Sequence, residues 1–309
     1  MSKNIAFIFP GQGSQVVGML SGLAADYPVI QETFAEASEA LHFDLWQLSQ
    51  EGPAECLNQT QLTQPTLLTA SVAMWRLWKQ AGGRLPSFMA GHSVGEYSAL
   101  VCAGSIDFLT AVQVVSERGR FMQEAVPEGA GAMAAIVGLE SAQLQALCDS
   151  LNDGQVLSPA NYNSIEQIVV AGNSEAVDKL VERAKQIGAK LAKRIPVSVP
   201  SHCALMKPAA KRLAQYLDGI SFLPLKCPVI NNVDVCIEKE SNAIKDALVR
   251  QLFNPVRWVE IVQWLQQRHI EFFVECGPGK VLASLNKRIT TIPTLSIHDS
   301  DTLRRSLIA

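Results

Sequence analysis

The sequence predicts an α/β fold that has a mainly parallel sheet at its core and a smaller β-α-β-β-α-β subdomain inserted into that core. Three observations support this fold class. Short apolar runs that suit buried strands alternate with helical segments along much of the chain. Between about residues 127 and 198 the order of the elements changes. A serine flanked by glycines, in GHSVG at residues 91–95, stands between one apolar run and a helical segment.

The core elements follow in order from the pattern of apolar residues. Residues 5–9, IAFIF, are a short apolar run that Pro10 ends, and FMA at 88–90 is another. Residues 65–80 have an amphipathic helical pattern, and good helix formers fill 94–103. The predicted strands of the core are residues 5–9, 88–90, 228–231 and 272–275. The predicted helices of the core are residues 16–25, 29–41, 65–80, 94–103, 107–125 and 280–288.

The segment between residues 127 and 198 has the element order of a ferredoxin-like subdomain. Its predicted strands are residues 132–139, 156–163, 167–171 and 189–198, and its predicted helices are residues 141–151 and 174–187. We therefore expect residues 127–198 to form an insert, and residues 1–126 and 199–309 to form the core. A small subdomain placed over the glycine-flanked serine would make a cleft.

The composition excludes several classes of protein. The chain has 309 residues, of which 48% are hydrophobic and 18% charged, as in a well-packed globular enzyme. A formal net charge of −3 gives no general affinity for nucleic acid or anionic membranes. No apolar run approaches the about 20 residues of a membrane span, and the N-terminus does not match a signal peptide. Seven scattered cysteines and five histidines show no metal-ligand spacing, so we expect a cytoplasmic protein without a metal.

The motif GHSVG is typical of a nucleophile elbow, which presents a serine at a sharp turn between a strand and a helix. Gly91 and Gly95 have no side chain to collide where the chain reverses, and Glu96 suits the positive end of the helix dipole. The alternative is a glycine-rich turn with an incidental serine, since five-residue matches also occur by chance. The flanking strand and helix favour the elbow, with Ser93 as nucleophile.

A serine nucleophile needs a base, and His202 is the histidine that the sequence favours. In RIPVSVPSHCALMKPA a predicted strand ends at Val199 and Pro200 turns the chain, so that His202 opens the next helix. A histidine there can face the cleft, although a helix-capping role fits the spacing equally well. His92 adjoins Ser93, but successive side chains diverge at a sharp turn, so we expect His92 to pack beneath the elbow.

The loop PGQGSQ after the first strand predicts an oxyanion hole, because Gly11 and Gly13 allow backbone N–H groups to face a ligand. Two nucleotide-binding alternatives fail on spacing. A dinucleotide fingerprint needs a glycine where Val16 stands, and a phosphate loop needs a lysine where Met19 stands. We expect an N–H group of this loop to bind an oxyanion together with the N–H group of Val94.

Arg118 lies on the apolar side of the predicted helix 107–125. Its neighbours three and four residues away are Val114, Val115, Phe121 and Met122. A buried guanidinium needs an anionic or hydrogen-bonded partner. Either a carboxylate of the chain forms a structural ion pair with Arg118, or its donors bind the carboxylate of a substrate in a bidentate manner. The spacing does not decide between these alternatives.

A hydrolase triad also needs an acid that orients the histidine. No aspartate or glutamate between Ser93 and His202 lies at a clear strand end, where a triad in Ser–acid–His order would place it. Either the acid lies in a loop or a neutral acceptor orients the histidine.

These motifs together resemble those of the malonyl-CoA:acyl-carrier-protein transacylases, the acyltransferases of bacterial fatty-acid synthesis. The similarity runs essentially from end to end. The shared motifs are FPGQGSQ (9–15), TQPTLLTAS (63–71), GHSVGEYSALVCAG (91–104), RGRFMQEAVPEGAGAMAAI (118–136), NYNSIEQIVVAG (161–172), VSVPSHCALM (197–206), FNPVRW (253–258) and ECGPGKVL (275–282). The resemblance implies a hydrolase-like α/β core with a ferredoxin-like insert.

The resemblance also implies roles for residues at matching positions. Ser93 would be the acylated nucleophile and His202 its base. The missing acid would be replaced by the backbone carbonyl of Gln251, which would accept the proton of the histidine. The backbone N–H groups of Gln12 and Val94 would bind the oxyanion.

The implied substrates are malonyl-CoA and the phosphopantetheine thiol of acyl carrier protein. The resemblance implies no cofactor, and the sequence allows the protein to be a monomer. Arg118 would bind the malonyl carboxylate, and Gln64 would lie near the pocket. The chain departs from the family at Ile165, where proline is frequent. Its residue before the histidine is Ser201, where multidomain relatives often have a bulky side chain, so this position does not by itself imply strict malonyl selectivity.

Two other functions fit parts of the pattern. A thioesterase would use water in place of the acceptor thiol, and a carrier-binding module would have lost its chemistry.

Acyl carrier proteins are acidic, so docking would need a local basic group. The candidates are Arg183, Lys185, Lys190, Lys193 and Arg194, and a second group of Lys280, Lys287 and Arg288. An ordinary solvated surface explains either group equally well.

Overall fold

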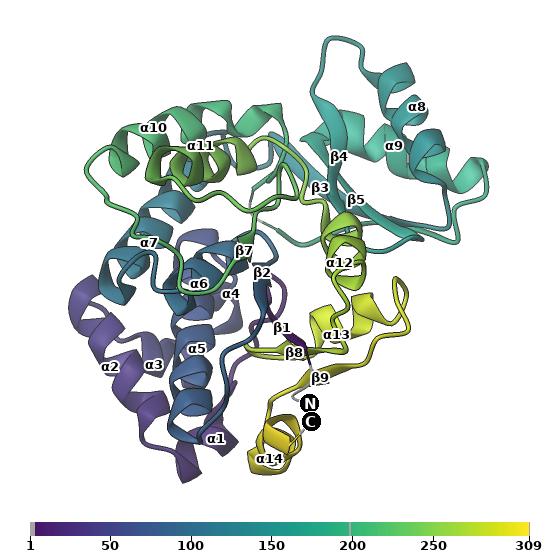
Figure 1. Ribbon diagram of the computed structural model, residues 1–309. Coiled ribbons are helices and arrows are strands. Elements are labelled where there is room, and N and C mark those ends of the chain that lie inside the picture. Colours follow the sequence, from purple (N-terminus) through teal and green to yellow (C-terminus); the bar gives the residue numbers. More distant parts are fainter. Residues whose placement is uncertain (1–3, 198, 309) are drawn as a thin grey trace.

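The computed structural model describes residues 4–197 and 199–308, and its two subdomains each contain a sheet (Figure 1). The larger subdomain has a five-stranded sheet in the order β7-β2-β1-β8-β9, and every neighbouring pair of strands is parallel. Its strands are β1 (Ile5–Phe9), β2 (Phe88–Gly91), β7 (Val229–Ile230), β8 (Phe272–Glu275) and β9 (Thr294–Ser296). The predicted parallel core is therefore confirmed.

Helices cover both faces of this sheet. They are α1 (Ser21–Asp26), α2 (Val29–Leu41), α3 (Leu45–Glu51), α4 (Ala54–Leu57), α5 (Thr60–Gln80), α6 (Gly95–Cys102), α7 (Phe108–Glu124), the short η1 (Ala204–Met206), α10 (Lys207–Leu217), α11 (Ser241–Gln251), α12 (Trp258–Gln266), α13 (Val281–Asn286) and α14 (Ser300–Ile308). Successive side chains of a strand point to opposite faces, so Phe7 and Phe9 pack with α5 and α7, whereas Ala6 and Ile8 pack with α12 and α13. Across the described residues, no helix combines the length and the apolar character needed to cross a membrane.

The smaller subdomain contains an antiparallel sheet in the order β4-β5-β3-β6. Its elements are β3 (Gly131–Val137), α8 (Ser141–Leu151), β4 (Leu157–Tyr162), β5 (Gln167–Asn173), α9 (Ser174–Gln186) and β6 (Leu191–Arg194). The two helices and the sheet share a separate apolar core. The predicted β-α-β-β-α-β subdomain is therefore present. Its boundaries at residues 127 and 198 stay a prediction, and residues 1–3, 198 and 309 lie outside the described residues.

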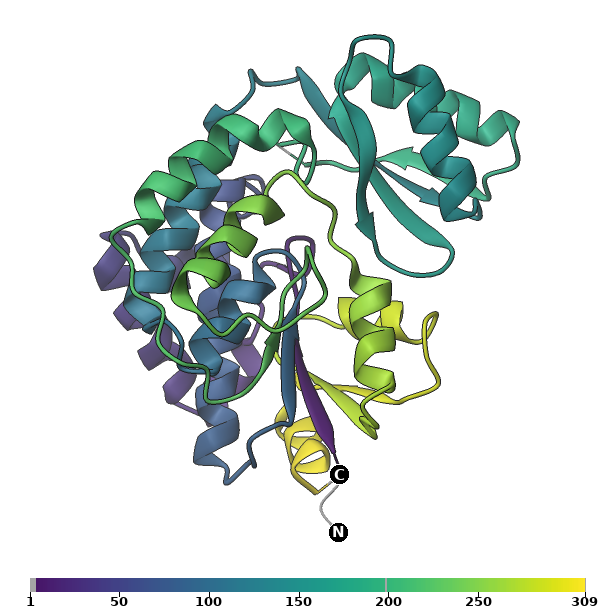
Figure 2. The same ribbon diagram turned by 45° about the horizontal axis from the view of Figure 1, so that its top comes forward.

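Main-chain hydrogen bonds hold the end of β4 against the larger subdomain. The N–H of Tyr162 donates to the carbonyl of Val256 (2.9 Å), and the N–H of Val256 donates to the carbonyl of Ala160 (2.9 Å). Val256 lies in the connection between α11 and α12. Figure 2 shows the smaller subdomain as a separate lobe, with the connection from α11 to α12 running toward it.

Several predicted boundaries are wrong. The strand predicted at 189–198 ends at Arg194, because Pro196 has no N–H to continue the ladder, and α10 begins only at Lys207. His202 therefore lies in a loop and does not open a helix. Residues 17–20 form turns before α1, and α5 begins at Thr60 with Pro65 inside it. The elements that the sequence did not predict are α3, α4, α11, α12, α14 and β9.

Candidate active site

Ser93 lies at the sharp turn between β2 and α6. Its φ of 54° is in the left-handed region, where a serine is strained. A Cβ atom on Gly91 would lie 1.9 Å from the carbonyl carbon of Gly95, and a Cβ atom on Gly95 would lie 2.2 Å from the carbonyl oxygen of Phe9. Only glycine fits at either position. The strand, turn and helix have the geometry of the predicted nucleophile elbow rather than that of an incidental loop.

The side chain of Asn232 holds this elbow from the loop after β7. Its Oδ1 accepts a hydrogen bond from the N–H of Ser93 (2.7 Å), and its Nδ2 donates to the carbonyl of Gly91 (2.6 Å). Two backbone groups that the strand and helix leave unpaired are thereby satisfied in a buried position. Sequence reasoning missed Asn232 because its loop carries no recognised motif.

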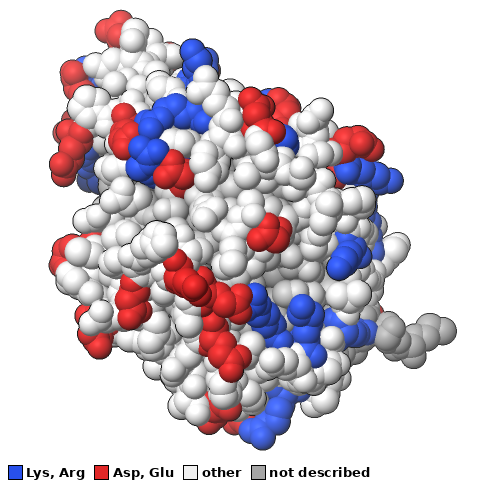
Figure 3. All heavy atoms as spheres, turned by 90° about the vertical axis from the view of Figure 1, so that its left-hand side faces the viewer, with Lys and Arg blue, Asp and Glu red and all other residues white. Residues whose placement is uncertain are grey.

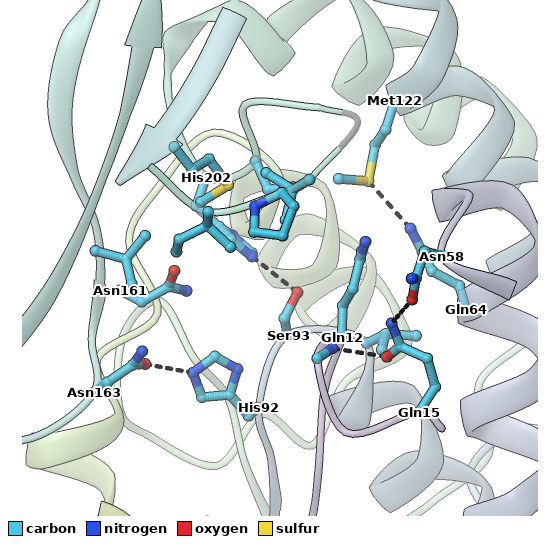
Figure 4. Close-up of a pocket in the computed structure, with 18 of the residues that line it drawn as sticks. Gln12, Gln15, Asn58, Gln64, His92, Ser93, Met122, Asn161, Asn163 and His202 are labelled. Carbon is cyan, nitrogen blue, oxygen red and sulfur yellow. Dashed lines mark hydrogen bonds between the residues drawn. The ribbon is translucent and has the colours of Figure 1, made fainter. Parts of the chain in front are cut away.

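Two hydrogen bonds connect Ser93, the ring of His202 and the main chain of Gln251. The Oγ atom of Ser93 lies 2.8 Å from Nε2 of His202 (Figure 4), and Nδ1 of His202 lies 2.8 Å from the carbonyl oxygen of Gln251. The N–H of His202 also donates to the carbonyl of Leu252 (3.0 Å). The C-terminal end of α11 therefore holds both the backbone and the ring of His202.

The imidazole of His202 is neutral at physiological pH. Burial and the positive charge of Arg118 lower the pKa of His202 to about 3. Because the carbonyl oxygen of Gln251 can only accept, Nδ1 carries the proton and Nε2 presents its lone pair to Ser93. The ring can therefore accept the proton of the serine hydroxyl.

The ring of His92 forms its hydrogen bond away from Ser93. Its Nε2 lies 2.8 Å from Oδ1 of Asn163 in the smaller subdomain (Figure 4), and its ring lies beside Trp258. His92 therefore links the elbow to the smaller subdomain, and it lines the same pocket as Ser93, whereas the sequence predicted a place beneath the elbow. Within residues 4–197 and 199–308, no carboxylate forms a hydrogen bond or an ion pair with His202. A main-chain carbonyl stands where a triad would have an acid.

Arg118 is buried beside Ser93, and uncharged oxygens hold its guanidinium. Nη1 donates to Oε1 of Gln64 (2.6 Å), and Nη2 donates to Oε1 of Gln251 (2.9 Å) and to Oγ of Ser93 (3.3 Å). Its Nε–H has no partner in the part of the chain that the structure describes. No carboxylate of that part lies within ion-pair distance of Arg118, so the structural ion pair considered from the sequence is absent there. The guanidinium keeps donors for a ligand.

A cavity of about 320 Å³ opens over Ser93 between the two subdomains. Gln12 and Val94 line it from the larger subdomain, and Met133 and Val169 line it from the smaller one. The backbone N–H groups of Gln12 and Val94 donate to no other residue described by the structure. Two unpaired N–H groups in a concave site next to Ser93 suit the binding of an oxyanion.

Comparisons with known proteins give the family. A family model described as the acyl transferase domain matches residues 6–292. The malonyl CoA-acyl carrier protein transacylase of Escherichia coli (strain K12) is 59% identical over 291 residues, which cover 94% of each chain. The solved structure of the malonyl CoA-acyl carrier protein transacylase from Coxiella burnetii has a TM-score of 0.98 at 52% identity, covering 99% of this chain and 97% of that one.

The chain belongs to the acyl transferase family. The resemblance identified from the sequence motifs is thereby confirmed. A further similar structure is a malonyl-transacylase in complex with the acyl-carrier protein of a type II PKS, with a TM-score of 0.98, 53% identity and 99% coverage of both chains.

In this acyltransferase the structure brings the predicted site residues together. They are Gln12, Gln64, Ser93, Val94, Arg118, His202 and Gln251. Sequence reasoning assigned only the main chain of Gln251 to the site, but its side-chain amide also contacts Arg118. It treated Glu96 as a helix-dipole residue, although the carboxylate accepts hydrogen bonds from Asn232 and Gln251.

The acyltransferase has one group of side chains, among those described, whose spacing could hold a metal ion: Asp234, Cys236 and Glu238. Both carboxylate oxygens of Asp234 already accept hydrogen bonds from Arg250 (2.9 and 2.6 Å), and the thiol of Cys236 donates to Glu238 (3.1 Å). None of the three lines the cavity over Ser93. This group therefore has its own partners and no part in the site.

Proposed function

We propose that this acyltransferase moves a malonyl group from malonyl-CoA to the phosphopantetheine thiol of acyl carrier protein in fatty-acid synthesis, through a malonyl ester of Ser93. The observation that carries the proposal is a buried cation beside the nucleophile, with Nη2 of Arg118 3.3 Å from Oγ of Ser93. The names of the similar proteins support the same substrates. The seven cysteines are free thiols, which agrees with a cytoplasmic location.

In the first half-reaction, Nε2 of His202 takes the proton of Ser93 while Oγ attacks the thioester carbonyl of malonyl-CoA. The carbonyl of Gln251 stabilises the imidazolium that forms. The oxyanion accepts hydrogen bonds from the N–H groups of Gln12 and Val94. The C–S bond then breaks, and His202 returns its proton to the leaving sulfur, so that coenzyme A departs as a thiol.

In the second half-reaction, the thiol of the carrier protein takes the place of coenzyme A. His202 removes the thiol proton, and the sulfur attacks the ester carbonyl of the malonyl group on Ser93. The C–O bond to Ser93 breaks, and the proton returns to Oγ. The kinetic mechanism is ping-pong, because the first product leaves before the second substrate reacts. Its two halves use the same groups in the same positions.

The malonyl carboxylate must leave water to reach Ser93. An unpaired buried carboxylate costs several kcal/mol, so a cation already in place favours malonyl over uncharged acyl groups. Gln64 and Gln251 hold the guanidinium of Arg118 without neutralising it. A carboxylate can then form the charge-assisted hydrogen bonds that Arg118 lacks in the free enzyme.

The alternatives fit the site less well. A general thioesterase, which acts on uncharged acyl groups, has no use for a buried cation that uncharged amides hold in place. A binding module without chemistry has no use for a strained serine 2.8 Å from a neutral histidine. These two observations favour acyl transfer over hydrolysis and over carrier binding alone.

A trapping experiment tests the proposal. The enzyme is incubated with labelled malonyl-CoA, and the adduct is located by mass spectrometry before carrier protein or buffer alone is added. We expect a stable malonyl ester on Ser93 that carrier protein discharges and water does not. Ser93→Ala should fold normally but form no adduct. Rapid discharge by water would support a thioesterase, and malonyl transfer by Ser93→Ala would refute the nucleophile.

A further inference from the structure

Glu96 is a buried carboxylate that the mechanism above does not use. It lies in the first turn of α6, and only 3% of its surface is exposed. A buried carboxylate is costly unless its oxygens accept hydrogen bonds. A single oxygen, Oε2, accepts from the N–H of Asn232 (2.9 Å) and from Nε2 of Gln251 (2.7 Å). The carboxylate therefore contacts two residues that in turn contact the nucleophile or Arg118.

The bond to Gln251 determines which end of that side-chain amide faces Arg118. An amide presents donors at its nitrogen and an acceptor at its oxygen. The nitrogen donates to Glu96 (2.7 Å) and to the carbonyl of Ser93 (3.2 Å), which leaves Oε1 to accept from Nη2 of Arg118 (2.9 Å). If the amide turned over, its N–H groups would face the N–H groups of the guanidinium. The acceptors at Glu96 and at the Ser93 carbonyl both disfavour this, and the contact to Glu96 is the shorter of the two.

The orientation of the Gln251 amide matters because it provides one of two short hydrogen bonds that place the guanidinium. The other comes from Gln64 at 2.6 Å. Without Gln251, Nη2 of Arg118 would keep only the longer contact to Ser93, at 3.3 Å. A bidentate contact depends on geometry, so a rotated guanidinium binds a carboxylate less well.

We propose that Glu96 is a positioning residue for acyl-group preference: its acceptor oxygen orients the Gln251 amide, which places Arg118 for the carboxylate of the acyl group. This inference rests on the malonyl transfer proposed above. The required property is an acceptor oxygen at the Oε2 position. A glutamine at residue 96 keeps such an oxygen and an alanine does not, so the two variants separate positioning from the loss of the side chain.

The test compares wild type, Glu96→Gln and Glu96→Ala by kcat/KM for malonyl-CoA and for acetyl-CoA with the same carrier protein. We expect Glu96→Ala to lower the malonyl-to-acetyl ratio at least about tenfold, mainly through the malonyl value, and Glu96→Gln to stay within about threefold of wild type. Equal losses for both thioesters in Glu96→Ala would mean a purely structural role and overturn the proposal. An equal fall of the ratio in Glu96→Gln would overturn it too, because charge would then be decisive.

Gln251→Leu provides an independent test, since it removes the amide and keeps the main-chain carbonyl. Gln251→Leu should lower the malonyl-to-acetyl ratio by a similar factor. Combining it with Glu96→Ala should lower this ratio no further, because both changes break the same series of hydrogen bonds from Glu96 through Gln251 to Arg118. An unchanged ratio in Gln251→Leu, or additive losses in the double variant, would overturn the proposal even if Glu96→Ala does not fold. Failure of wild type to form the malonyl adduct would instead refute the proposed function itself.

Discussion

In the proposed function, Arg118 is the residue on which acyl-group preference depends most directly. Its guanidinium is buried, and its short hydrogen bonds go to the amide oxygens of Gln64 and Gln251. A buried charge with neutral partners is incompletely compensated, so a carboxylate that enters the cavity gains a strong partner. At the scale of single residues, the proposed preference for a charged acyl group therefore comes from a buried cation whose hydrogen-bond partners are uncharged.

We expect Arg118→Ala to lower kcat/KM for malonyl-CoA about 10²-fold or more, because the substrate carboxylate would lose the cation beside Ser93. Transfer from acetyl-CoA should change little or improve. The measurement is the malonyl-to-acetyl ratio in wild type and variant, with thermal melts alongside. A ratio equal to that of wild type would exclude the binding of the malonyl carboxylate by Arg118.

Glu96 predicts how stability depends on pH. Burial raises the pKa of Glu96 from 4.5 to about 7. At a pH between these two values, Glu96 is therefore protonated in the folded protein and ionised in the unfolded chain. The stability that this proton on Glu96 contributes is fully present below pH 4.5 and is lost as pH rises through about 7. On account of this group, the free energy of unfolding should fall by about 3 kcal/mol between pH 5 and pH 8.

Glu96→Gln removes this titration. In urea unfolding at a series of pH values, the variant should gain stability relative to wild type as pH rises from 5 to 8. Parallel curves for the two proteins would show that Glu96 ionises normally in the folded state.

At the scale of elements, two helices carry two of the polar groups that line the cavity over Ser93. The helix α5 carries Gln64, and α7 carries Arg118. They approach closely at Gly119, where a Cβ atom would lie 2.6 Å from the Cα of Gln61. A backbone atom cannot move aside as a side chain can. The spacing of α5 and α7 therefore depends on this glycine.

Gly119→Ala should push α5 and α7 apart, at a cost of about 1–3 kcal/mol in the free energy of unfolding. It should also lower malonyl transfer in the fraction that folds, since the bond between Gln64 and Arg118 would lengthen. Gly22→Ala is a matched control, because a Cβ atom there meets nothing within 4 Å in a helical position. If both variants melt at the same temperature, the helices do not need the close approach.

At the scale of the whole molecule, the surface has both signs of charge. Figure 3 shows acidic and basic side chains in neighbouring patches on the face at the left of Figure 1, so an acidic carrier protein requires a local basic group. In the smaller subdomain, Lys190 pairs with Glu166 (3.2 Å) and Arg194 with Asp178 (3.4 Å). No ion pair within the described residues involves Lys280, Lys287 or Arg288, which are exposed at α13.

We therefore expect the group at α13 to contribute more to carrier docking. Lys287→Glu combined with Arg288→Glu should raise KM for carrier protein about tenfold while KM for malonyl-CoA stays unchanged, and added salt should reduce the difference. The matched control is Lys190→Glu with Arg194→Glu, which reverses two charges that already have partners. Equal effects of both double variants on both substrates would count against docking at α13.

The sequence by itself determined the elements whose signal is local. Apolar runs located β1, β2 and β8, and GHSVG located the elbow, because the collision of any Cβ atom at Gly91 or Gly95 is a property of the turn itself. The predicted start of a helix at His202 is wrong because distant contacts decide the conformation there. The loop around His202 has no local signal, since its conformation is held by the carbonyl of Leu252 and the ring by that of Gln251.

Only the tertiary structure decided what Arg118 and Glu96 contact. For Arg118 the sequence allowed both a structural ion pair and the binding of a substrate carboxylate. The helical pattern shows that a side chain is buried, but it does not show what lies opposite that side chain. The partners Gln64 and Gln251 come from α5 and α11, 54 and 133 residues away along the chain. Asn232 reaches the elbow from 139 residues away. Hydrogen bonds between such distant segments form only when the whole sheet and its helices have packed, and no short stretch of sequence encodes them.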